Sequence, residues 1–153
     1  MIHEINVQFN EQYHALAEPA RRAAEMVLKY EQAPPGAVSI VLTDADALRS
    51  ANRQFAGIDT TTDVLSFTDG EAMPDADGVY FGDVLIAVPI ASQQAKRGGH
   101  SLEDEVSLLT IHGMLHLMGQ DHAQPDGKAA MWARQKAILA LLEIDESVMD
   151  ATL

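Results

Sequence analysis

The feature that most constrains this chain is an apolar segment, residues 109–122, that carries three histidines. His112 and His116 are four residues apart, so on an α-helix both rings lie on one face, a turn apart. Gly119 follows where such a helix should end, because glycine readily takes the left-handed conformation of a helix C-terminus. His122 comes three residues later and can face the first two rings. The spacing therefore predicts three imidazoles around one point with a fourth position open, as in a catalytic zinc site.

A structural role for the two helical histidines is the alternative. The residues around His112 and His116 are mostly leucine, isoleucine and methionine, so the helix is expected to be buried on most of its surface. A buried imidazole without a partner costs about 1–3 kcal/mol. One metal ion would satisfy both rings, and the metal site is therefore the preferred interpretation.

The histidine spacing equals that of the metzincin proteases, His-x-x-x-His-x-x-Gly-x-x-His. Those proteases carry glutamate directly after the first histidine, where it serves as the general base. Here that position is Gly113, which has no side chain. The spacing alone leaves three readings open: a base from elsewhere in the chain, a metal-activated water that acts largely alone, or a site that does not hydrolyse peptides.

Length and composition predict one domain over residues 1–153. A chain of 153 residues can bury a core of its own, and no apolar run approaches the roughly 18 residues needed to span a membrane. The N-terminus lacks the basic and apolar regions of a signal peptide. Cysteine is absent, which excludes disulfides and thiolate ligands and fits a reducing compartment. We therefore expect a cytoplasmic protein; the sequence leaves its oligomeric state open.

The net charge of −13 disfavours a general nucleic-acid-binding module, since phosphate binding draws on lysine and arginine. An enzyme with one focused site is less affected, provided that a local basic patch and the metal offset the acidity. Lys96 and Arg97, next to two glycines, form the most basic local patch of the chain.

Hydrophobic periodicity predicts an α+β domain with one four-stranded sheet and about five helices. The sheet should be covered mostly on one side, with the metal-bearing helix central. Trp132 can stack on a base, but a lone aromatic at helical spacing is expected to pack against the metal-bearing helix. The acidic tail, 144–153, is expected to fray. The predicted strands are 2–9, 37–42, 64–67 and 80–88, and the predicted helices are 19–30, 44–55, 89–97, 102–118 and 128–142.

The histidine segment, His112-Gly-x-Leu-His116-Leu-x-Gly119-x-Asp121-His122, resembles the signature of the YbeY-type bacterial endoribonucleases. A second segment, 57–67, is similar to that family's Gly-x-Asp loop and Thr-Asp-Val-Leu-Ser-Phe strand. The resemblance implies a zincin-like fold and one Zn²⁺ ion. It also implies cleavage of single-stranded RNA in 3′-end maturation of 16S ribosomal RNA and in ribosome quality control, with proteins of the small ribosomal subunit as partners.

Two further residues are candidates for the catalytic site. Where the family has an arginine before the glycine of the second segment, this chain has Ala56; Arg53, three residues earlier on the same helical face, has a side chain long enough to reach a similar place. Asp63 is a candidate for positioning water or substrate. Asp121, beside a predicted ligand, is expected to orient an imidazole or to cap the turn. A metzincin-like peptidase, another metallohydrolase, and a ribosome-assembly protein with a structural metal are the alternative functions.

Overall fold

The structure is a computed structural model that describes residues 3–68, 78–119 and 125–152. Four strands form one mixed sheet in the order β1-β2-β4-β3, in which β1, β2 and β4 are parallel and β3 pairs antiparallel with β4. The α+β prediction is confirmed, and β3 is an edge strand. The strands are β1 His3–Phe9, β2 Gly36–Thr43, β3 Val64–Thr68 and β4 Val79–Ala87.

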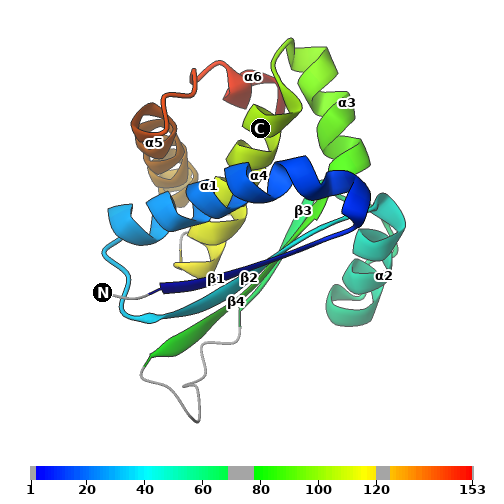
Figure 1. The fold of residues 1–153 in the computed structure, drawn as a ribbon, viewed down its shortest axis with the longest axis horizontal. Helices are drawn as coiled ribbons and strands as arrows, with labels where there is room; N and C mark the ends of the chain where they lie inside the picture. The colour runs from blue at the N-terminus through cyan, green and yellow to red at the C-terminus, as the bar shows by residue number, and fades with distance from the viewer. Residues whose placement is uncertain (1–2, 69–77, 120–124, 153) are drawn as a thin grey trace.

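The described residues also form six α-helices and one 3-10 helix, one α-helix more than the sequence predicts. Figure 1 shows α1 and α4 over one face of the sheet and α2 at one end of it. The helices are η1 Glu11–Leu16 (3-10), α1 Ala17–Tyr30, α2 Ala45–Ala56, α3 Val88–Gly98, α4 Leu102–Leu117, α5 Pro125–Leu141 and α6 Val148–Thr152. Within the described part of the chain, none of them has the length and apolarity needed to cross a lipid bilayer.

The sequence patterns explain the layers. In β1 the side chains alternate, with the apolar residues Ile5, Val7 and Phe9 packed against the core and the intervening polar residues exposed. In β2 residues 36–40 are all buried, as expected of an inner strand of a parallel arrangement. The core therefore lies between this sheet and the helices over it.

Helix α4 is the central helix, as predicted. It packs against α1, α3, α5, α6 and two strands, so every residue from Glu105 to Leu115 is buried. Its start at Leu102 agrees with the predicted helix, and the Ser101 hydroxyl caps it by accepting from the backbone N–H of Asp104 at 3.1 Å. Gly119 follows the last turn with a positive φ of 91°, as predicted for a glycine that ends the helix.

The C-terminal tail corrects one expectation. Instead of fraying, part of it forms α6, and Val148 and Met149 are almost fully buried against the helices. Helix α6 packs against α3 and α4, and this packing removes the two apolar side chains from water. The sequence reasoning missed this helix because five residues are too few to display a helical period.

Candidate active site

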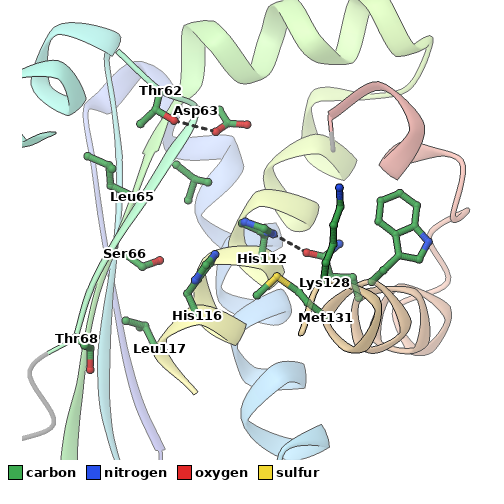
Figure 2. A pocket seen from close by; sticks show the side chains of 13 residues that line it. Thr62, Asp63, Leu65, Ser66, Thr68, His112, His116, Leu117, Lys128 and Met131 are labelled. Atoms are coloured by element: carbon green, nitrogen blue, oxygen red, sulfur yellow. Dashed lines mark hydrogen bonds between the residues drawn. The ribbon is translucent and has the colours of Figure 1, made fainter. Parts of the chain in front are cut away.

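A cavity of about 660 Å³ opens between β3, the end of α4 and the start of α5 (Figure 2). The predicted metal-bearing helix supplies its two described histidines, and the edge strand supplies the facing wall. The lining residues are Thr62, Asp63, Val64, Leu65, Ser66 and Thr68 from the β3 side, His112, His116 and Leu117 from α4, and Lys128, Met131, Trp132 and Gln135 from α5.

Gly113 allows α4 to approach the sheet closely beside this cavity. A Cβ atom there would lie 2.6 Å from Cγ1 of Val84 and 3.0 Å from Oγ of Ser66. The Ser66 hydroxyl donates a hydrogen bond to the Gly113 carbonyl at 2.9 Å, which ties the helix to the edge strand. In metzincins the residue at this position carries the general base. Here β3 and β4 occupy the space beside Gly113, so a side chain does not fit.

His112 is held in a defined orientation by a residue from α5. Its Nδ1 lies 2.7 Å from Oε1 of Gln135, and both side chains are buried, with exposed fractions of 9% and 1%. The Gln135 amide is itself oriented, because its Nε2 donates to Sδ of Met149 at 3.6 Å. Its Oε1 can only accept, so Nδ1 of His112 is the donor; in the neutral form of the ring the lone pair is then on Nε2.

The two described histidines are arranged as the spacing predicts. The ring centroids of His112 and His116 are 4.8 Å apart, with the ring planes at 73°, and Figure 2 shows both rings on the cavity side of α4. His122 and Asp121 lie outside the described residues. Among residues 3–68, 78–119 and 125–152, no group of three histidine, aspartate or glutamate side chains is arranged to hold a metal ion.

The donor set fits zinc at this point of the fold. A ligating histidine usually donates its second ring N–H to a carbonyl or carboxylate, which fixes the tautomer and directs the other nitrogen at the metal. Gln135 gives His112 this arrangement. Two neutral imidazoles are the nitrogen ligands that zinc prefers, and a third from His122 would complete a site with an open position.

Asp63 lines the cavity but lies away from the histidines. Figure 2 shows its carboxylate above both imidazoles, at the opposite end of the β3 wall from Thr68. The carboxylate accepts hydrogen bonds from Thr62 and from Gln94, each at 3.3 Å. The backbone carbonyl of Asp63 accepts from the N–H of Ala87 at 2.9 Å. These contacts hold Asp63 at the upper rim of the cavity.

Arg53 is exposed on α2 and does not line the cavity. The nearby loop is held by another arginine, since Nε of Arg49 donates to Asp59 at 2.8 Å. This hydrogen bond, more than any other contact, holds the pKa of the Asp59 carboxyl below its usual value. Gly57 ends α2 in the left-handed conformation, with φ at 72°, so the turn after Ala56 forms as the sequence indicates.

The comparisons with known proteins identify the family of this chain. The family model described as Endoribonuclease YbeY matches residues 2–143. This range includes the histidine segment, 112–122, and the loop-and-strand segment, 57–67. The chain belongs to the Endoribonuclease YbeY family. It is therefore a member of a family of hydrolases, and the resemblance drawn from the histidine segment is confirmed.

Curated members of the YbeY family are similar over most of the chain. An endoribonuclease YbeY from Chloroflexus aurantiacus is 42% identical over 150 residues, which cover 93% of this chain and 97% of the relative. One from Symbiobacterium thermophilum is 40% identical over 142 residues, covering 88% and 89%. The solution structure of a Thermotoga maritima protein covers 91% of both chains with a TM-score of 0.58 and 24% identity, and it supports the fold.

Three features of this YbeY-family cavity were missed or misread in the sequence. Gln135 and Lys128 were not singled out, because nothing in the sequence marks a residue of α5 as facing histidines far away in the chain. Trp132 does not pack in the core as expected: it is 36% exposed and lines the cavity. Lys96 and Arg97, by contrast, are exposed at the end of α3 and lie outside the cavity lining.

Proposed function

We propose that this chain is a zinc-dependent endoribonuclease that cuts single-stranded RNA. A single zincin-like domain over residues 1–153 would hold one Zn²⁺ ion on His112, His116 and His122. The observation that carries this proposal is the pair of imidazoles on α4, one of them oriented by Gln135, beside a cavity in a chain of the YbeY family. The acidic composition is compatible with it because the phosphodiester would meet a focused site rather than a general binding surface.

The residues of the chain have separate roles in this proposal. Gln135 keeps Nδ1 of His112 protonated, which directs the Nε2 lone pair to the metal. When bound, zinc supplies a Lewis acid that offsets negative charge on the phosphodiester. Asp63, at the upper rim, would position water or the RNA, and Asp121 would orient an imidazole or cap the turn. Arg53 would reach toward RNA from α2, in place of the arginine that the family has where this chain has Ala56.

The biological role follows from the family resemblance. We propose that the substrate is ribosomal RNA, that the chain acts in 3′-end maturation of 16S rRNA and in ribosome quality control, and that it works in the cytoplasm. Proteins of the small ribosomal subunit are the expected partners. The names of the curated relatives support the endoribonuclease activity from which this role is inferred.

Peptide hydrolysis is the weaker alternative, and the contacts of Gly113 disfavour it. A glutamate base at this position would have to start from a Cβ within 2.6 Å of Val84, pointing at the sheet. A metzincin-type base at this position is therefore disfavoured. A ribosome-assembly protein with a structural metal is the other alternative, and it predicts a different response to metal removal.

The test is cleavage of an unstructured single-stranded RNA by the purified chain, with casein as the parallel substrate. His116→Ala should abolish cleavage, while His14→Ala, which removes an exposed histidine elsewhere, should leave the rate unchanged. A chelator should stop turnover before the domain unfolds; a structural metal would give the reverse order. Equal RNA cleavage by the parent and His116→Ala would overturn the proposal, as would cleavage of casein alone.

Arg53 is tested in the same assay. Arg53→Ala should slow RNA cleavage, whereas Arg97→Ala, which removes an exposed arginine outside the cavity, should not. If both variants cleave at the rate of the parent, Arg53 has no part in the reaction.

A further inference from the structure

The start of α5 presents an aromatic ring and a positive charge side by side in the cavity. Lys128 and Trp132 are four residues apart, so their side chains are neighbours on one face of the helix, with Cβ atoms about 5–6 Å apart. Both line the cavity that holds His112 and His116. Figure 2 shows Lys128 on α5, across the cavity from the β3 wall.

The exposure of Trp132 is not required by the packing of α5. The neighbouring Met131 and the later Gln135 are buried at 2% and 1%, so α5 packs through that side. Trp132 remains 36% exposed, although indole is among the side chains that gain most from burial. An aromatic ring that stays accessible in a cavity has a free face on which a planar ligand can stack.

Lys128 places a positive charge beside this ring. Among the described lining residues, Lys128 is the single lysine or arginine, and Asp63, at the upper rim, is the single carboxylate. The chain as a whole carries a net charge of −13, so a polyanion gains no attraction from the overall field. A cation placed next to the histidines is therefore the local contact that a phosphate can use.

We propose that Lys128 and Trp132 bind one nucleotide of single-stranded RNA, with the base stacked on Trp132 and a neighbouring phosphate paired with Lys128. This inference rests on the proposed function and extends it to the wall of the cavity opposite β3. Stacking requires an unpaired base, because the faces of paired bases are covered by their neighbours in a helix. The same contact accepts every base, since each has a π face, so this wall selects single strands and not a sequence.

The chain contains one tryptophan, so its fluorescence reports on this wall directly. The full-length parent is titrated with a short 2′-O-methylated oligouridylate, and a saturable change in tryptophan emission is expected. Affinity is measured in parallel from the anisotropy of a labelled copy of the same oligonucleotide. Trp132→Leu should weaken binding about 5- to 150-fold, the range for loss of one stacked base, and Trp132→Phe should restore most of it.

Lys128 is tested through the salt dependence of the same binding. Lys128→Gln should lower the slope of log affinity against log salt by about 0.7, the value for one phosphate contact on a single strand. The matched control is Lys136→Gln on the same helix; Lys136 is exposed, pairs with Glu146 at 3.1 Å and lies outside the cavity lining. That control should change neither affinity nor slope.

The outcomes separate this inference from the proposed function. If the parent cleaves RNA, but Trp132→Leu and Lys128→Gln bind the oligonucleotide as tightly as the parent, the inference is wrong and the nuclease proposal stands. If the oligonucleotide changes Trp132 emission and the variants weaken binding, but no RNA is cleaved, the binding role of Lys128 and Trp132 is supported and the nuclease proposal fails. A saturable change with an unstructured peptide and none with the oligonucleotide would overturn the inference.

Discussion

Helices α4 and α1 pack against each other, yet they handle polar side chains in opposite ways. Three polar side chains of α4 are buried and have specific partners: Glu105 contacts His100 at 2.5 Å, Thr110 donates to the carbonyl of Val106 at 2.8 Å, and His112 contacts Gln135. Because each group is surrounded by apolar side chains, a wrong partner or none would leave it unsatisfied at a cost of about 1–3 kcal/mol.

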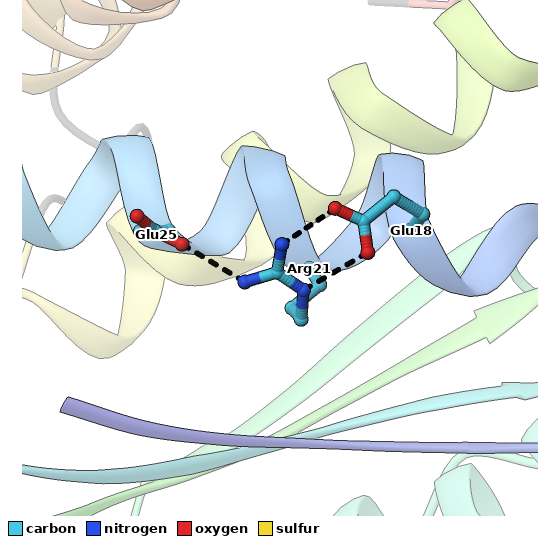
Figure 3. A network of polar contacts seen from close by, with 3 residues as sticks. All are labelled: Glu18, Arg21 and Glu25. Carbon is cyan, nitrogen blue, oxygen red and sulfur yellow. Dashed lines mark hydrogen bonds and ion pairs between the residues drawn. The ribbon is translucent and has the colours of Figure 1, made fainter.

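Helix α1 is amphipathic and keeps its charges in water. Its buried side consists of alanine, valine and leucine, while its outer side carries the exposed cluster Glu18, Arg21 and Glu25 (Figure 3). Arg21 donates two hydrogen bonds to Glu18, at 2.5 and 3.0 Å, and one to Glu25 at 2.9 Å. The hydrogen bonds with Glu18 are the largest cause of the raised pKa of Arg21.

Short polar distances therefore contribute differently to stability in the two helices. The exposed cluster exchanges bonds to water for bonds to protein, and solvent screens its charges. The buried ring of His112 cannot replace its hydrogen bond to Gln135 with one to water. This contact therefore fixes both the orientation of the ring and the nitrogen that carries the proton. Residues that matter for function should therefore be sought among the buried polar partners of α4.

The largest effect is expected when the buried contact is broken. Gln135→Leu leaves the Nδ1–H of His112 without its acceptor and should lower the free energy of unfolding by about 1–3 kcal/mol. It should also weaken zinc binding about 10- to 100-fold. Denaturant unfolding of the metal-free chain and zinc titration measure the two effects, and ¹⁵N NMR should detect less Nδ1-protonated His112. Gln93→Leu, at an exposed glutamine, is the control; equal behaviour of the two variants would contradict the comparison.

An intermediate effect is expected from crowding the buried helix. Gly113→Ala places a Cβ 2.6 Å from Val84, an overpacking cost of about 1–3 kcal/mol, against a gain in helix propensity of about 1 kcal/mol. The net result should be a loss of up to about 2 kcal/mol in denaturant unfolding. Gly98→Ala, at an exposed helical glycine, should instead be neutral or slightly stabilising. A stabilised Gly113→Ala would show that α4 is not tightly fitted to the sheet.

The smallest effect is expected in the exposed cluster. Arg21 holds the pKa of Glu18 below its usual value, chiefly through the hydrogen bonds between them. A lowered carboxyl pKa favours folding above the ordinary pKa, and this contribution is lost as the pH falls through the lowered value. Arg21→Ala should return the Glu18 pKa, followed by carboxyl NMR, toward its ordinary value while thermal unfolding at neutral pH barely changes. A large loss of stability would mean that the exposed cluster matters as much as the buried one.

Much of the fold was predictable because its signals are local. Alternation marks β1, side-chain caps at Ser101 and Asp44 stand at the starts of α4 and α2, and Gly119 follows α4 where expected. The order of elements and the central position of α4 follow from hydrophobic patterns alone. The number of helices was underestimated because α6 is too short to show a period, and its burial depends on helices distant in the chain.

By itself the sequence determined the histidine segment: the spacing of His112 and His116 puts both rings on one helical face whatever surrounds them. It also determined the family, since that signature is carried by residues close together in the chain. Only the tertiary structure decided which side chains meet those rings. Gln135 is 23 positions from His112, and Trp132 and Lys128 belong to a helix whose rotation is set by packing and not by its own pattern. Long-range neighbours of this kind depend on how the helices pack on the sheet, which no local spacing records.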